Sequence, residues 1–131
     1  MPQTTLLVFR DPSKRSPLVE WLNELEEAEP KAFARCLARI QQLEMSGHEL
    51  RRPAADILGK KIHELRAKVG RVHYRILYFF YERERNVACL THGFTKEGPV
   101  PDAEIEYAIQ AKKLVDRDRD RYAMEWEVSD G

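Results

Sequence analysis

Three basic residues alternate with apolar or aromatic ones in the middle of this chain. Arg71, His73 and Arg75 are each separated by one residue, so at the two-residue period of a β-strand their side chains project from one face. A strand face with clustered cations suits a polyanion better than it suits the closing of a core. We expect these groups to converge on a concave, solvent-open surface wide enough for a nucleotide.

Basic side chains of these types can cleave RNA without a metal ion, by attack of a 2′-hydroxyl on the adjacent phosphate. The reaction needs a proton acceptor, positive charge on the phosphorane and a donor for the leaving oxygen. Arginine binds two phosphate oxygens at once, lysine among other cations can act as a base, and histidine can serve as acid or base. The candidates on adjacent predicted strands are Arg66, Arg71, His73, Arg75, His92 and Lys96.

Each candidate also has a structural alternative. Arg66 follows a glutamate two residues earlier and can be half of a solvated ion pair, and Arg75 in mid-strand can form a buried one. His73 and His92 can be sheet histidines with satisfied hydrogen bonds, and Lys96 a lysine that closes its strand. These readings stay open on the sequence alone.

Other common sites lack support in the sequence. The glycines are scattered singly, so no phosphate-binding loop is predicted. The four histidines share no metal-ligand spacing with each other or with the two cysteines, and the serines lie in turns or termini. We predict no metal site and no cofactor.

Composition and charge describe a globular protein with an uneven charge distribution. The 131 residues are 43% hydrophobic and 34% charged, with a net charge of zero, which is typical of one domain with its own core. Lys60 to Arg85 carries eight basic against three acidic residues, whereas residues 101–131 carry five against nine. The basic middle is a footprint for an anionic partner.

No feature predicts export or membrane insertion. No apolar run approaches the roughly 18 residues that span a membrane, and the first residues lack the basic start of a signal peptide. Cys36 and Cys89 lie in apolar patterns, typical of reduced, buried thiols. We expect a cytoplasmic protein without a membrane partner.

The N-terminal third predicts a strand and two helices. Thr4–Arg10 is an apolar run that Asp11-Pro12 ends. One helix begins after Ser16 at Pro17, and a second begins at Pro30 and ends near Gly47. Helices joined so closely form an antiparallel hairpin, which needs a sheet to cover its apolar stripe.

The middle of the chain predicts an antiparallel meander. After a loop over 48–59, strands are expected at Lys61–Arg66, Arg71–Tyr81 and Asn86–Thr95. A last helix opens at Pro101-Asp102.

Residues 116–131 either continue the last helix through intrahelical ion pairs or form a mobile tail. The prediction is a single α+β domain over 1–131: an N-terminal helical hairpin packed on a twisted, mostly antiparallel four-stranded sheet, and a C-terminal helix.

Two stretches resemble a known family. HELRAKVGRVHYRILYFF and LTHGFTKEGPVPDAEIEYAIQ carry an E-L-R, Y-R-I-L-Y, H-G-F-x-K and E-I-x-x-A pattern. This pattern resembles the RelE/ParE/HigB superfamily of bacterial type II toxins, closest to its phage-derived HigB-like branch. The resemblance implies a RelE-like fold and a metal-free endoribonuclease that cuts mRNA on the ribosome. It also implies neutralisation by a cognate antitoxin, usually a helix-turn-helix protein.

The resemblance implies roles for particular residues. Arg66, Arg75 and Lys96 match the family's basic active-site positions, with Arg75 on the phosphate and the other two in transition-state or proton-transfer roles. The residues expected to bind RNA are Lys61, Lys68, Arg71, His73 and His92.

Two other functions remain open. The protein can be a non-catalytic binder, such as a ParE-like inhibitor of DNA gyrase or a degenerate toxin that only binds its antitoxin. Alternatively, the cations only make surface ion pairs.

Overall fold

Six strands form one sheet in the order β2-β3-β4-β5-β1-β6, in a computed structural model that describes residues 3–127. The strands are β1 (Thr5–Phe9), β2 (Ala55–Gly59), β3 (Ile62–Val69), β4 (Val72–Phe80), β5 (Val87–Thr95) and β6 (Ala123–Glu125). The α-helices are α1 (Pro17–Ala28), α2 (Pro30–Ser46), α3 (Asp102–Arg117) and α4 (Arg119–Tyr122), and a 3-10 turn spans Gly47–Glu49. The protein is therefore α+β.

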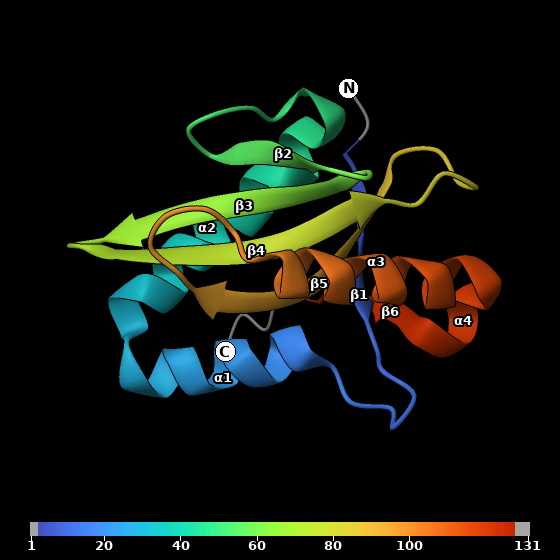
Figure 1. Ribbon diagram of the computed structural model, residues 1–131, viewed down its shortest axis with the longest axis horizontal. Coiled ribbons are helices and arrows are strands. Elements are labelled where there is room, and N and C mark those ends of the chain that lie inside the picture. Colours follow the sequence, from blue (N-terminus) through green and yellow to red (C-terminus); the bar gives the residue numbers. More distant parts are fainter. Residues whose placement is uncertain (1–2, 128–131) are drawn as a thin grey trace.

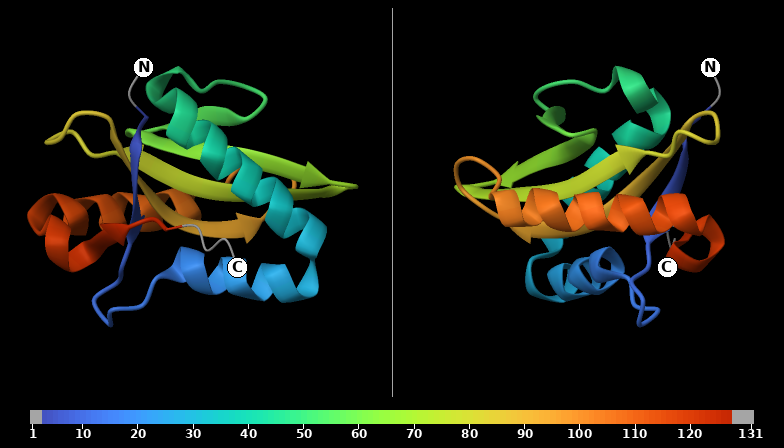
Figure 2. Two further views of the ribbon diagram at one scale, coloured as in Figure 1. Left: turned by 180° about the vertical axis from the view of Figure 1, so that it is seen from behind. Right: turned by 45° about the vertical axis from the view of Figure 1, so that its right-hand side comes forward.

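The helices cover the two faces of the sheet, α1 and α2 on one and α3 on the other (Figures 1 and 2). Alternation along the strands supplies an apolar surface to each face. The core under α1 and α2 includes Leu22, Ile40, Leu65, Ile76 and Leu90. The core under α3 includes Leu77, Phe79, Cys89, Ala108 and Val115.

The predicted helical hairpin and last helix are confirmed. The Ser16 hydroxyl accepts the Val19 N–H at 3.4 Å, as expected of an N-cap, and Pro17 and Pro30 open their helices. These local signals fixed the helix starts because they depend on a few neighbouring residues.

The predicted number of strands is wrong: the sheet has six strands, not four. β2 lies in the segment predicted as a loop. It is an edge strand paired only with β3, and its register shifts between Ile57 and Gly59. Because the pairing is irregular, the strand does not need a strict alternation of apolar and polar residues, and its sequence has none. The sheet is mostly antiparallel as predicted, but β1 pairs with β5 in parallel.

The last helix ends at Arg117, so the alternative in which the tail continues this helix is wrong. The chain turns through α4, and β6 pairs antiparallel with β1. The Trp126 N–H then donates to the Leu6 carbonyl at 3.0 Å. The rest of the predicted tail, 128–131, lies outside the described residues.

Both cysteines are buried and unbridged, and burial raises the pKa of the Cys36 thiol to about 12. Across residues 3–127, no helix combines the length and apolar character needed to span a membrane.

Candidate functional site

An open hollow of about 520 Å³ lies between β2, β3, β4 and the start of α3. The loop that leads from β5 to α3 crosses in front of β4 (Figure 1). The polar lining of the hollow consists of Arg52, Asp56, Glu64, Arg66, His73 and Arg75, and we call this hollow the basic hollow. Arg66 and Arg75 face each other across the β3–β4 ladder, which places two guanidinium groups side by side.

Arg75 is held inside the protein. Its side chain is 8% exposed, and Nη1 lies 2.8 Å from the Glu64 carboxylate. Nε donates to the Lys96 carbonyl at 3.1 Å and Nη2 to the Gly98 carbonyl at 2.7 Å. Of the two alternatives left open for Arg75, the structure contains the buried ion pair. The guanidinium was expected on a solvent-open surface, but it lies inside the protein.

Arg66 is the more accessible guanidinium of the pair. Its side chain is 35% exposed, and Nε lies 3.7 Å from the second oxygen of Glu64. Glu64 therefore lies between Arg66 and Arg75, and its single charge offsets only one of theirs. Arg66 keeps positive charge facing the hollow.

At the rim, Arg52 and Asp56 form a salt bridge at 2.6 Å. The Arg52 guanidinium, together with the Ile57 N–H, holds the pKa of the Asp56 carboxyl below its usual value. Because these two charges neutralise each other, the net charge of the basic hollow comes from the β3 and β4 residues.

Further cations extend this end of the sheet. Lys68 and Arg71 are exposed beside the β3–β4 turn, and Lys68 pairs with His73 in the ladder. The exposed Lys96 donates its backbone N–H to the His73 carbonyl at 3.2 Å. The structure therefore brings Arg66, Lys68, Arg71, His73 and Lys96 to one end of the sheet.

Two arginines that the sequence analysis missed join this group from α2. Arg39 Nε donates to the Arg66 carbonyl at 2.7 Å, and Arg35 Nη1 donates to the Lys68 carbonyl at 3.2 Å. These carbonyls lie beyond Leu65, where the β2 pairing of β3 ends. The four-residue spacing of the two arginines predicts a shared helix face, but no sequence signal places that face beside β3.

Comparison with family models gives one match. Residues 20–113 match the family described as "Phage derived protein Gp49-like (DUF891)". The chain belongs to this family. The Gp49-like family is a RelE/HigB-like toxin family of toxin–antitoxin systems, which indicates an antitoxin partner. The matched region runs from α1 to α3 and includes every basic residue described above. No curated protein matched the chain.

Lys61 does not join the basic end of this Gp49-like chain. Its ammonium group pairs with Glu82 at 2.9 Å, near the β4–β5 turn. Lys61 precedes Lys68 by seven residues, or roughly 20 Å along an extended strand. Lys61 was predicted to bind RNA with the others, but the structure places it at the opposite end of the sheet.

His92 also lies apart from the basic hollow. Its side chain is 11% exposed, and Nε2 lies 3.3 Å from the Glu104 carboxylate. Nδ1 lies 2.9 Å from the Thr91 hydroxyl. Burial lowers the pKa of His92, and Glu104 partly opposes this effect.

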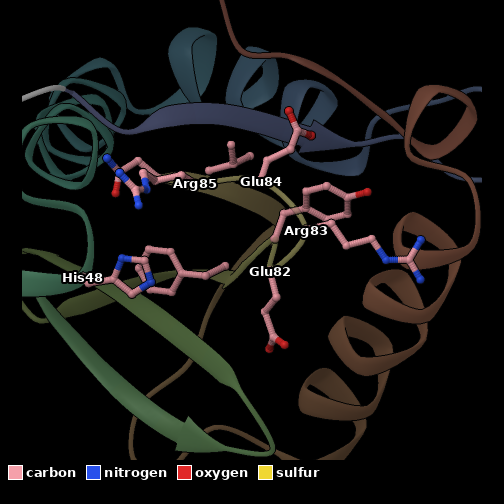
Figure 3. A pocket seen from close by; sticks show the side chains of 9 residues that line it. His48, Glu82, Arg83, Glu84 and Arg85 are labelled. Atoms are coloured by element: carbon pink, nitrogen blue, oxygen red, sulfur yellow. The ribbon is translucent and has the colours of Figure 1, made fainter.

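A second hollow of about 450 Å³ lies by the β4–β5 turn. The His48 ring stacks on Phe80 there with ring centroids 3.6 Å apart. Figure 3 shows that Arg83 and Arg85 point to opposite sides, and the acidic residues Glu82 and Glu84 alternate with them in sequence. Because its cations do not converge, this hollow is a weaker candidate for a polyanion site.

Among residues 3–127, no group of three or more histidine, cysteine, aspartate or glutamate side chains could hold a metal ion.

Proposed function

We propose that this protein is the toxin of a toxin–antitoxin system, with a RelE-like fold of the HigB-like branch. We further propose that it is a metal-independent endoribonuclease that cleaves mRNA on the ribosome. Membership of the Gp49-like family supports the toxin role. The observation that carries the nuclease proposal is the basic hollow, whose volume of about 520 Å³ lies in the usual range of ligand sites, about 300–1,000 Å³.

In this proposal Arg66 stabilises the phosphorane. It combines a half-exposed guanidinium with an unbalanced charge in the hollow, and it can offer two N–H groups to phosphate oxygens. His73 lines the same hollow and serves as proton acceptor or donor. Lys96, beside His73, supplies a further cation or proton donor.

Arg75 is a positioning residue in this proposal and does not contact the phosphate. Its bonds to Glu64 and to the carbonyls of Lys96 and Gly98 fix the loop that carries Lys96. The same ion pair orients the carboxylate next to Arg66. Replacement of Arg75 would therefore disturb both the site and the fold.

The exposed cations around the hollow bind the RNA backbone. Lys68 and Arg71 on the hairpin and Arg35 on α2 continue the positive surface beyond the hollow. Contacts of this kind give affinity without sequence preference. A helix-turn-helix antitoxin would neutralise the toxin.

Cleavage of a reporter mRNA in a bacterial translation extract, mapped by primer extension, tests the nuclease role. Arg66→Gln should reduce cleavage about 100-fold, the usual loss on removing one charge-stabilising donor, and leave the unfolding midpoint unchanged. Lys61→Gln is the matched control and should cleave like the unaltered protein. Full cleavage by folded Arg66→Gln would remove Arg66 from the mechanism.

The non-catalytic alternative is favoured by one observation, the buried Glu64 carboxylate that lines the basic hollow and offsets part of its positive charge. A ParE-like inhibitor would block supercoiling by purified DNA gyrase and leave mRNA intact. Intact mRNA with blocked supercoiling would therefore support this alternative over the nuclease.

A further inference from the structure

A third hollow, of about 540 Å³, lies between α1, α3 and the end of β5. Its rings come from Trp21, His92 and Tyr107, and we call it the acidic hollow because four carboxylates also line it. These carboxylates belong to Asp11, Glu20, Glu24 and Glu104, and Arg15 adds the one cation of the lining.

The charge of the acidic hollow is not balanced from within. Arg15 is occupied by a salt bridge with Glu20. Asp11 accepts hydrogen bonds from the Ser13 hydroxyl and from two backbone N–H groups, and these bonds hold the pKa of its carboxyl below the usual value. The carboxylates of Asp11 and Glu24 therefore form no salt bridge with a basic residue of the lining, whereas Glu104 lies 3.3 Å from His92.

His92 lines the acidic hollow and has a partner at each ring nitrogen. Nδ1 lies 2.9 Å from the Thr91 hydroxyl, which also donates to the Leu77 carbonyl at 3.2 Å. Nε2 lies 3.3 Å from a Glu104 oxygen.

Glu104 can still accept a hydrogen bond from a ligand. Only one of its oxygens is bonded to His92, and its side chain is 33% exposed. An ionised carboxylate has about four acceptor sites, so a cationic N–H group in the hollow could bond to the second oxygen.

The acidic hollow also borders an unpaired strand edge. β1 pairs with β5 only as far as Leu90, and within 3–127 no other strand extends that side of β5 along residues 91–95. A Cβ on Gly93 would lie 2.3 Å from the Trp21 ring, so the glycine lets this ring lie directly against the strand. An extended peptide could hydrogen-bond to the edge beside the rings.

We propose that the acidic hollow binds the side chain of an arginine or lysine carried by an extended segment of a partner polypeptide that pairs with the edge of β5. The carboxylates supply charge, the rings of Trp21 and Tyr107 supply cation–π contacts, and the strand edge supplies backbone partners. The proposal rests on this surface alone and does not depend on nuclease activity. Membership of a toxin–antitoxin family makes the antitoxin the first polypeptide to search for such a segment.

Titration of the full chain with acetyl-Val-Arg-Val-amide, followed by NMR, tests the proposal. We expect the Trp21 indole and Gly93 amide signals to shift, with at least tenfold weaker binding of the same peptide carrying citrulline, the neutral isostere of arginine. Equal binding of both peptides, or shifts confined to the β3–β4 hairpin, would overturn it.

Variants on exposed positions of α1 provide a matched comparison. Glu24→Gln should weaken binding of the arginine peptide about threefold, since it removes one of the two lining carboxylates that form no salt bridge. Glu27→Gln, on the same helix but outside the lining, should not change it. Equal effects of the two substitutions would show non-specific attraction and would also overturn the proposal.

Discussion

Replacement of Arg75 by methionine should destabilise the protein strongly, because it leaves the Glu64 carboxylate buried without its main partner. The two side chains are 8% and 4% exposed and lie 2.8 Å apart. Removal of one partner of such a buried pair costs about 3–5 kcal/mol. The substitution also removes the donors to the Lys96 and Gly98 carbonyls, so the upper part of this range is expected.

Urea unfolding followed by circular dichroism measures this effect. With a dependence of about 1.5 kcal/mol per molar urea, the midpoint should fall by about 2–3 M. The double variant Arg75→Met/Glu64→Met removes the unpaired charge and should recover most of the loss, because an apolar pair can replace a buried ion pair at similar stability. Arg66→Met, at a half-exposed position, should lower the midpoint by less than about 0.7 M, or about 1 kcal/mol.

The positioning role of Arg75 is refuted if Arg75→Met unfolds within 0.5 M of the unaltered protein and still fails to arrest growth. That result would mean that Arg75 acts on the substrate directly.

Two further predictions concern stability. Gly93→Ala should cost about 1–3 kcal/mol, because the new methyl group would lie 2.3 Å from the Trp21 ring; a melting temperature within 1 °C of the unaltered protein would contradict this. Burial lowers the pKa of His63 and of His92, so the unfolded chain binds protons first as the pH falls below about 6.5. The free energy of unfolding should therefore be highest above that pH and decline below it, and His63→Gln should make the decline smaller. Equal urea midpoints at pH 7.5 and pH 5.5 would contradict the lowered pKa values.

The parts of the fold that depend on local signals could be predicted from sequence. Ser16 and the prolines marked the helix starts. The alternation put His73 and Arg75 on one side of β4, where both line the basic hollow, whereas Arg71 lies before the strand begins. β2 and β6 could not be recognised, because short edge strands are defined by their neighbours and not by their own pattern.

The site was less predictable, because its chemistry depends on register and on loop closure. The burial of Arg75 results from the pairing of β3 with β4, which brings Glu64 within reach, and from the return of the chain at Gly98. Similarly, the distance of Lys61 from the basic end follows from its place at the other end of β3. None of these relations is visible in the spacing of the residues along the chain.

The position of β1 in the sheet has a consequence for synthesis. This strand lies between β5 and β6, both of which leave the ribosome after it. At roughly 5–20 residues per second, about 6–23 s separate the translation of Phe9 from that of Ala123. The sheet therefore cannot be completed until β6 has been made, and β1 lacks both neighbours for most of the synthesis of the chain.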